Sequence, residues 1–534
     1  MAGMVVAPQP RAVEEGVGVL REGGNAVDAA LTAALVQGVI DFQMCGLGGF
    51  GTFQVFLAAS ARHEVIDFHG TAGSRVSPDM WRDLFLGDAR PDQGYWIEGL
   101  LNDVGYGAIT TPGTLAGFQE IWRRYGTRSW KELFGPAIRL AAEGFPVTAE
   151  LRSFWVREES TPARADGYHR LTWTPEARRV YTRGGEVYRQ GETLVQLDLA
   201  RTLERVADEG SDLFYRGEIA EQIDRDFEAN GGYVTAEDLA AYQAVHGEPV
   251  RVTYRGYEVL SSPPPGGGVT VLQVLKILEA YDLAALGHNS ADYIYLVARA
   301  MGAAFADRAR EMGDPRFVEV PVDDMLSDER AARWRRRLDS GDPIEVAKLA
   351  VEAPTTTHLS VLDRRGNAVA MTHSLGSSAG VVTPGLGFMF NNCMNSFDPI
   401  PGGPNDIRPG KARITGMAPT IVTRQGRPHL ILGAPGGPRI MNGVLQTILN
   451  SLDFAMTPVE AVSAARFDCQ GEHVDLENRI TLEVEDELSR RGLRTERHHA
   501  AYEPYFSLVQ LIRVEGDRAR GGADPRRGGL ALEA

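Results

Sequence analysis

The sequence predicts a soluble globular protein of mixed α and β structure, in which helices and sheets pack as layers. Two observations support this fold class. Apolar residues make up 43% and charged residues 24% of the 534 residues, close to the average for globular proteins. Segments with helical periodicity dominate the first two thirds of the chain, and strand-like segments become frequent only after a linker that ends at Pro354.

Length and charge limit the function further. A chain of 534 residues corresponds to about three to four average domains, although large α/β enzymes often fold that much sequence into one unit. The net charge of −16 argues against a nucleic acid or an anionic membrane as the main partner. The charge by itself identifies no substrate.

The cysteines and the N-terminus bear on the cellular compartment. Cys45, Cys393 and Cys469 are far apart and form no CxxC pair, so we expect neither disulfides nor a zinc site. The first residues lack the basic and apolar regions of a signal peptide, and no later stretch has about 18 uninterrupted apolar residues. We therefore expect no export, no membrane span and a cytoplasmic location.

The first elements are two helices and a strand. Residues 11–40 read as two helices separated at Gly23 and Gly24, with Asn25 as the N-cap of the second helix and Asp28 three residues later. The second helix is rich in alanine and is expected to be buried. A glycine string at 46–51 precedes a strand at 52–57, whereas a dinucleotide-binding loop would follow a strand and open a helix.

Further helices fill the middle of the chain. We expect the segments 111–146 and 269–283 to be largely helical, and Thr235 to begin another helix with a capping-box pattern. The glycines at 266–268 lack the lysine and hydroxyl pair of a phosphate-binding loop. The highly charged stretch 323–342 is predicted to be a solvated helix leading into the linker.

After the linker the pattern changes to strands. The segments 357–362 and 368–374 flank a turn at 363–367 and predict a hairpin. The segments 418–423 and 429–432 predict a second hairpin, which runs into a glycine loop at 433–437. The helical pattern then returns in two segments, 444–452 and 458–465.

The common catalytic motifs are absent. The sequence contains no HExxH, no GxSxG and no pair of histidines at metal-ligand spacing, so we expect no metal and no cofactor. His498 and His499 are adjacent and would point in different directions on a regular element, which favours a surface pair over a ligand pair.

One threonine run stands out when its surroundings are considered. Thr355, Thr356 and Thr357 precede His358 at the start of a predicted strand, and such a run alone indicates only β propensity. Ordered strings follow it: GNAVA at 366–370, NNCM at 391–394, GMAPTIV at 416–422, GAPGGPRI at 433–440 and GADPR at 522–526. Together they resemble the small subunit of the γ-glutamyltranspeptidase family.

The resemblance covers nearly the whole chain. It extends upstream through LREGGNAVDAA at 20–30, GLGG at 46–49 and TPGTLAGF at 111–118. It implies an αββα sandwich of the N-terminal nucleophile (Ntn) hydrolases, made as a precursor that cuts itself into a large subunit, 1–355, and a small subunit, 356–534. The two subunits would stay associated and could form a larger oligomer.

The resemblance also assigns catalytic roles. The family's threonine–any residue–histidine pattern, anchored on His358, makes Thr356 the nucleophile, although the threonine run allows a shift of one residue. The freed α-amine of Thr356, with an ordinary pKa of roughly 7.7–8.0, would act as its own base. Ser374 replaces a threonine that orients the nucleophile. Gly436 and Gly437 match the pair whose N–H groups form the oxyanion hole.

The substrate-binding positions depart from the family pattern. The arginine that holds the substrate α-carboxylate is replaced by His69, expected to be a partly charged imidazole, and the acid that holds the α-ammonium is replaced by Ser396. The family's serine pair and its amide residue are also replaced. These positions, with the cysteine after the asparagine pair, define the expected substrate pocket: His69, Gly376, Cys393, Ser396, Thr415 and Gly416.

Two classes of function remain open at this point. The leading hypothesis is an autoprocessing amidohydrolase or acyltransferase whose substrate is a small acid amide or another N-acyl compound, with Lys411, Arg413 or Arg439 as the carboxylate ligand. A true γ-glutamyltransferase with substituted contacts remains possible on the sequence, with water or an amine as acceptor. The alternative class is an unprocessed, non-catalytic family member that binds a metabolite.

Overall fold

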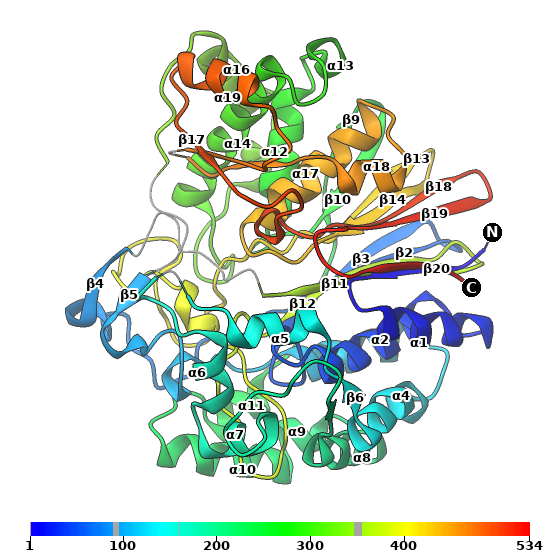
Figure 1. The fold of residues 1–534 in the computed structure, drawn as a ribbon, viewed down its shortest axis with the longest axis vertical. Coiled ribbons are helices and arrows are strands. Elements are labelled where there is room, and N and C mark those ends of the chain that lie inside the picture. Colours follow the sequence, from blue (N-terminus) through cyan, green and yellow to red (C-terminus); the bar gives the residue numbers. More distant parts are fainter. Residues whose placement is uncertain (1, 89–94, 160, 347–354, 472) are drawn as a thin grey trace.

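The computed structural model describes residues 2–88, 95–159, 161–346, 355–471 and 473–534. Two large antiparallel sheets lie face to face, and helices cover the outer face of each sheet (Figure 1). The layers therefore follow the order α, β, β, α. This arrangement confirms the fold class that the family resemblance implies.

The first sheet has the strand order β20-β1-β11-β12-β2-β3-β8, with every neighbouring pair antiparallel. Its strands are β1 (Met4–Ala7), β2 (Phe50–Leu57), β3 (Arg62–Phe68), β8 (Val245–Gly247), β11 (Thr357–Leu362), β12 (Ala368–Ser374) and β20 (Leu530–Glu533). The helices on its side are α1 (Pro10–Arg21), α2 (Ala26–Ile40), α3 (Thr114–Tyr125), α4 (Trp130–Glu143) and α8 (Leu197–Glu209).

The second sheet has the order β19-β18-β14-β13-β10-β9. Its strands are β9 (Val250–Tyr254), β10 (Tyr257–Ser261), β13 (Thr420–Arg424), β14 (Arg427–Gly433), β18 (Gln510–Glu515) and β19 (Arg518–Ala523). Its helices are α12 (Gly268–Leu278), α14 (Ala291–Glu311), α16 (Asp328–Asp339), α17 (Arg439–Leu452) and α18 (Pro458–Ser463).

Smaller elements complete the described chain. The helices are α5 (Ala149–Val156), α6 (Gly167–Thr172), α7 (Pro175–Tyr181), α9 (Asp212–Tyr215), α10 (Glu218–Ala229), α11 (Ala236–Ala241), α13 (Leu283–Leu286), α15 (Val322–Met325) and α19 (Leu482–Arg490). The strands are β4 (Phe85–Asp88), β5 (Tyr95–Ile97), β6 (Phe145–Pro146), β7 (Thr193–Leu194), β15 (Phe467–Cys469), β16 (Val474–Leu476) and β17 (Thr495–Arg497).

The hydrophobic core is divided by the sheets. Phe56, Ile421, Ile431 and Ile512 belong to the apolar layer between the two sheets. Larger clusters lie between each sheet and its helices. Because strand side chains alternate between the two faces, each central strand buries one row of residues under helices and the other row against the opposite sheet.

Several predicted elements are confirmed. The Asn25 side chain accepts hydrogen bonds from the N–H groups of Val27 and Asp28, and the Asp28 carboxylate accepts one from the Asn25 N–H, so α2 begins with a capping box. Thr235 caps α11 in the same way. Both predicted hairpins are present, as β11–β12 and β13–β14.

Three helix predictions need correction. Helix α12 ends at Leu278, before the predicted 283, because Asp282 caps a separate short helix, α13. Helix α17 begins at Arg439, earlier than the predicted 444, directly after the glycine loop. The charged stretch at 323–342 forms α15 and α16, and Trp334 and Leu338 of α16 are buried, so this segment is only half solvated. The rest of the linker, 347–354, lies outside the described residues.

Both sheets draw strands from both sides of Thr356. Strands β11, β12 and β20 from 356–534 sit among strands from 1–355 in the first sheet, and β13 extends β10 in the second. The two ends of the chain also meet, since the Ala534 N–H donates a hydrogen bond to the Gly3 carbonyl (Figure 1). A cut before Thr356 would therefore leave two fragments that both contribute strands to each of the two sheets.

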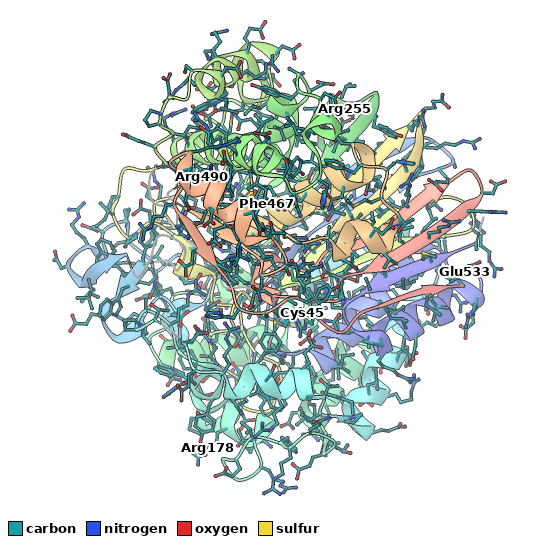
Figure 2. The ribbon with its side chains drawn as sticks, turned by 45° about the horizontal axis from the view of Figure 1, so that its top comes forward. Cys45, Arg178, Arg255, Phe467, Arg490 and Glu533 are labelled. Atoms are coloured by element: carbon teal, nitrogen blue, oxygen red, sulfur yellow. The ribbon has the colours of Figure 1, made fainter. Side chains whose placement is uncertain are left out.

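Surface and interior separate in the usual way. Charged side chains such as Arg178 and Arg490 lie at the outside, whereas Cys45 and Phe467 are buried (Figure 2). All three cysteines are buried and free. Within the described residues, no helix combines the length and the apolar character that a membrane crossing requires.

Candidate active site

Thr356 lies immediately before β11, which is a central strand of the first sheet. Its side chain is buried, with 4% of the residue exposed. Thr357 points to the helical side, where its hydroxyl contacts Gln9 and Gln37 at 3.1 Å. Because strand side chains alternate, Thr356 and His358 face the second sheet. The candidate nucleophile is thus fixed at the sheet–sheet interface.

The hydroxyls of Thr356 and Ser374 converge on one carbonyl oxygen. Each lies 2.7 Å from the oxygen of Thr355, and the two hydroxyl oxygens are 3.1 Å apart. The Ser374 hydroxyl also accepts a hydrogen bond from the Gly376 N–H at 2.8 Å. Ser374 is placed here by the β11–β12 hairpin, and the arrangement polarises the carbonyl of the predicted scissile bond.

His358 supports the site without exchanging protons near neutral pH. Its ring hydrogen-bonds to the hydroxyls of Thr372 and Ser360, at 2.8 and 3.1 Å. It packs so closely on Gly433 that a Cβ at that position would lie 2.3 Å from the ring. Burial, aided by nearby His373, lowers the pKa of His358 to about 3, so the imidazole is neutral. His358 therefore joins the two sheets beside Thr356.

The glycine loop begins where β14 ends and leads into α17. Gly436 and Gly437 have φ angles of 138° and 60°, a region that glycine occupies easily. The carbonyl oxygen of Gly437 lies so close to Gly416 that a Cβ there would be 2.2 Å away. Gly416, a departure from the family's serine pair, therefore lets the segment before β13 pack directly against the loop.

The candidate substrate pocket is the group of side chains beside Ser374. Phe50 of β2 is the register partner of Ser374, and Phe50 clusters with Cys393 and Met417. The His69 ring lies 5.9 Å from the Phe50 ring and contacts the Thr52 hydroxyl at 3.2 Å. The structure thus brings His69 and Cys393 to one side of the candidate nucleophile.

The expectation of a partly charged His69 is wrong. Burial is the main reason, and the positive charges of Arg413 and Arg316 add to it, so the pKa of His69 falls to about 3. The imidazole is neutral at neutral pH and cannot replace the family's guanidinium. Burial likewise raises the pKa of the Cys393 thiol, which keeps it protonated.

Arg413 brings a positive charge to this pocket from another segment. Its guanidinium carbon lies 4.9 Å from the centre of the Phe50 ring, and its Nη1 donates to the Ile414 carbonyl. Burial and nearby Arg308 lower the pKa of Arg413 to about 9, which leaves it charged at neutral pH. The structure therefore places a guanidinium on the His69 side.

The other two predicted cations have different surroundings. Lys411 is fully buried and donates to Asp406 at 2.7 Å, so its charge is balanced. Arg439 stacks on the Tyr505 ring, 3.5 Å from its centre. The contact with Phe50 described above is made by Arg413.

The remaining departures have local structural reasons. Gly376 has a φ of 71°, and a Cβ there would lie 2.3 Å from Asn392 Oδ1, so the family's amide side chain does not fit. Thr415 accepts hydrogen bonds from the N–H of Met417 and, at its carbonyl, from Arg308. The Ser396 hydroxyl donates to the Asn395 side chain, and its carbonyl accepts a hydrogen bond from Asn405.

The sequence did not reveal one group of supporting residues. Arg170 donates to the Asp103 carboxylate and to the Ser378 carbonyl, and Asn392 donates to Asp103. These bonds hold the turn that follows Ser374. A cavity of about 70 Å³ beside them is lined in part by Thr355 and Ser377. Because the partners are up to 289 residues apart, no local pattern could have linked them.

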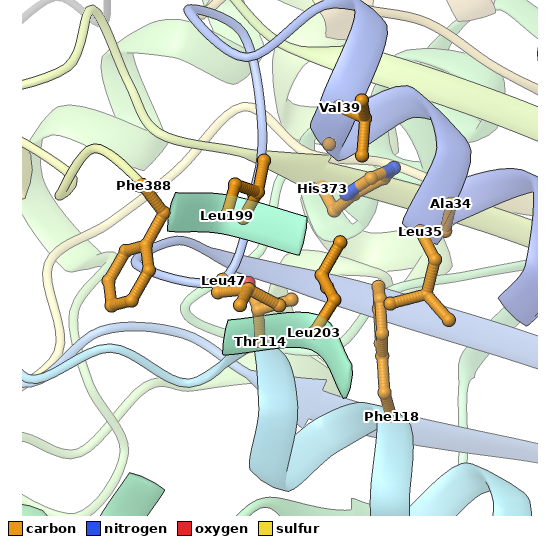
Figure 3. A pocket seen from close by; sticks show the side chains of 12 residues that line it. Ala34, Leu35, Val39, Leu47, Thr114, Phe118, Leu199, Leu203, His373 and Phe388 are labelled. Atoms are coloured by element: carbon orange, nitrogen blue, oxygen red, sulfur yellow. The ribbon is translucent and has the colours of Figure 1, made fainter. Parts of the chain in front are cut away.

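A second small cavity lies on the opposite face of β12. It is lined by side chains of α2, α3 and α8 together with His373 and Phe388 (Figure 3). Its volume of about 20 Å³ is enough for roughly one water molecule. The cavity lies on the face of β12 opposite the side chains of Ser374 and Thr356, so it is not the candidate substrate site.

Comparison with known proteins decides the family. A sequence model described as "Gamma-glutamyltranspeptidase" matches residues 12–534. The chain belongs to the gamma-glutamyltranspeptidase family. It is 38% identical to the glutathione hydrolase proenzyme of Escherichia coli K12 over 98% of this chain and 90% of the relative. It is 37% identical to the acylase ACY 1 proenzyme of Pseudomonas sp. V22 over 92% and 86%.

Solved structures agree with this assignment. The crystal structure of a cephalosporin acylase from Bacillus halodurans superposes with a TM-score of 0.87 at 28% identity, over 99% of this chain and 95% of the other. The chain is therefore an enzyme of the Ntn amidohydrolase and acyltransferase type. Its relatives are proenzymes named both as glutathione hydrolases and as acylases, so family membership does not fix the substrate.

Proposed function

We propose that this chain cuts itself before Thr356 and then uses the new N-terminal threonine to cleave an amide bond. The observation that carries the proposal is the convergence of the Thr356 and Ser374 hydroxyls on the Thr355 carbonyl at 2.7 Å. The naming of close relatives as proenzymes supports it. Fragments 1–355 and 356–534 would remain associated through the shared sheets.

The cut proceeds by transfer of an acyl group from nitrogen to oxygen. The Thr356 hydroxyl oxygen attacks the carbonyl carbon of Thr355, and its proton moves to the amide nitrogen as the C–N bond breaks. Ser374 donates to the carbonyl oxygen as negative charge develops there. Water then hydrolyses the resulting ester, which leaves a carboxylate on Thr355 and a free α-amine on Thr356.

Turnover repeats the same chemistry on an external amide. The α-amine of Thr356, with an ordinary pKa of roughly 7.7–8.0, takes the hydroxyl proton as the oxygen attacks the substrate carbonyl carbon. It gives the proton to the substrate nitrogen as the C–N bond breaks, so the amine leaves and the acyl group stays on Thr356 as an ester. The N–H groups of Gly436 and Gly437 stabilise the oxyanion, where one donor contributes about 3–4 kcal/mol. Water or an amine then releases the acyl group.

The acyl group that fits best carries a carboxylate but no α-ammonium. Arg413 supplies a buried cation beside Phe50, whereas the position of the family's ammonium-binding acid is Ser396, a neutral residue bonded to Asn395. A buried ammonium without an acidic partner is unfavourable by several kcal/mol. We therefore propose a small acid amide as substrate, with Arg413 as the carboxylate ligand.

Intact mass under denaturing conditions tests the cut. After incubation at neutral pH we expect fragments 1–355 and 356–534, with Thr356 as the new N-terminus. Thr356→Ala should remain uncut, while Thr355→Ala should still be cut before Thr356, which resolves the one-residue ambiguity. A wild-type chain that stays whole would refute self-cleavage and support the non-catalytic alternative.

A matched substrate pair tests the acyl group. Glutaryl-p-nitroanilide and γ-glutamyl-p-nitroanilide share the carboxylate and differ only in the α-amino group. We expect higher kcat/KM for the glutaryl compound. A preference for the γ-glutamyl compound would instead identify a true γ-glutamyltransferase with substituted contacts, and addition of an amine acceptor would separate transfer from hydrolysis.

A further inference from the structure

A cluster of histidine and carboxylate side chains lies on the small sheet formed by β15, β16 and β17. Strands β16 and β17 are parallel and pair Asp475 with Glu496. His473 lies two residues before Asp475. Side chains two residues apart, or opposite each other in neighbouring strands, share one face of a sheet, so all three side chains point the same way.

The distances suit a metal ion. The ligand atoms of His473, Asp475 and Glu496 all lie within 4.8 Å of one another. His473 Nε2 is 3.3 Å from Asp475 Oδ2. Two ligands bound tetrahedrally to Zn²⁺ at about 2.0–2.1 Å are separated by about 3.3 Å, so this pair needs little movement. Glu496 is exposed and can close on the ion from the solvent side.

Other residues hold the central carboxylate in place. Asp475 is 5% exposed, and His498 Nε2 contacts its other oxygen, Oδ1, at 3.0 Å. The Tyr505 hydroxyl donates to Oδ2 at 3.0 Å. These contacts orient the carboxylate, as the outer-shell partners of a metal ligand do.

We propose that His473, Asp475 and Glu496 form a binding site for a divalent transition-metal ion, with Zn²⁺ the best fit. One imidazole and two carboxylates suit Zn²⁺ better than Mg²⁺ or Ca²⁺, which prefer oxygen ligands only. The sequence did not suggest the site, because its ligands come from two strands that are separated along the chain. Of the adjacent histidines, His498 contacts Asp475, whereas the His499 carbonyl accepts a hydrogen bond from Asn478.

The site would act structurally. The Tyr505 hydroxyl donates a hydrogen bond to Asp475, and the Arg439 guanidinium stacks on the Tyr505 ring. Arg439 is the first residue of α17, directly after the glycine loop. A bound ion would link β16 to β17 and so stabilise the small sheet. The proposal does not depend on self-cleavage or on the substrate.

Titration of untagged, chelator-treated protein with Zn²⁺, followed by calorimetry, tests the site. We expect one ion per chain and a higher melting temperature when Zn²⁺ is present. His473→Ala and Glu496→Gln should each weaken binding by at least about tenfold, since even partners outside the ligand shell contribute that much. Glu496→Gln alters an exposed side chain, so it serves even if His473→Ala folds poorly.

His499→Ala is the matched control. In the described part of the chain the His499 ring takes part in no ion pair, and only its backbone carbonyl is bonded, to Asn478. This variant should bind Zn²⁺ as the wild type does. Failure of the wild type to bind Zn²⁺, or equal binding by wild type, His473→Ala and Glu496→Gln, would overturn the proposal.

Discussion

Replacing Ser374 by alanine should slow self-cleavage strongly. In the uncut chain the Thr355 carbonyl oxygen accepts hydrogen bonds from the Thr356 and Ser374 hydroxyls, both at 2.7 Å. Thr356 loses its proton as it attacks, so Ser374 is the donor that remains when charge develops on this oxygen. Removal of one such donor typically raises a barrier by about 2.7–4 kcal/mol, which is a rate loss of about 100- to 1,000-fold.

The same substitution should lower stability moderately. The buried Gly376 N–H donates to the Ser374 hydroxyl at 2.8 Å and would lose its acceptor. An unsatisfied buried donor reduces the free energy of unfolding by about 1–3 kcal/mol. The variant should still fold, because the hairpin bonds between β11 and β12 remain.

The assay is the time course of fragments 1–355 and 356–534 at neutral pH, by denaturing mass spectrometry. Ser374→Thr, which restores the hydroxyl found in the family, should recover most of the rate. Ser451→Ala removes a buried hydroxyl in α17 that bonds only to the Thr447 carbonyl, and it should cut normally. If folded Ser374→Ala cuts within a few-fold of the wild-type rate, the role assigned to Ser374 is wrong.

Three further outcomes are expected. Gly416→Ala would place a Cβ 2.2 Å from the Gly437 carbonyl, so unfolding measurements should show a loss of about 1–3 kcal/mol together with slower turnover. Arg413→Met should lower kcat/KM for the glutaryl amide by about 10- to 150-fold, the worth of a charged hydrogen bond of about 1.5–3 kcal/mol, whereas Arg408→Met, on the same segment, should not. Burial lowers the pKa of three histidines to about 3: His69, His358 and His373. Below pH 6.5 the unfolded chain binds protons at these histidines, whereas the folded chain does not. The free energy of unfolding therefore decreases as pH falls from 6.5 toward 3, by up to about 4 kcal/mol between pH 7 and 5.5. Denaturant midpoints at both pH values should show this loss, and His373→Gln should remove about a third of it.

The candidate substrate pocket departs from the family pattern in two ways. Gly376 and Gly416 are required by close contacts, with Asn392 and Gly437, so restoring the family side chains would strain the chain. His69 and Ser396, in contrast, change the charge of the pocket. Arg413 partly offsets that change, because it brings a positive charge to the pocket from a different segment. The family positions by themselves do not reveal this charge.

The sequence by itself determined the family, the order of most elements and the candidate nucleophile. Capping at Asn25, the turn at 363–367 and the threonine–histidine pattern are local signals, and each acts within a few residues. The tertiary structure decided what depends on distant partners. It alone showed that burial makes His69 neutral, that Arg413 stacks on Phe50 and that the small sheet gathers a histidine and two carboxylates. Burial and charge at these positions arise from segments far apart in the chain, and no local pattern encodes them.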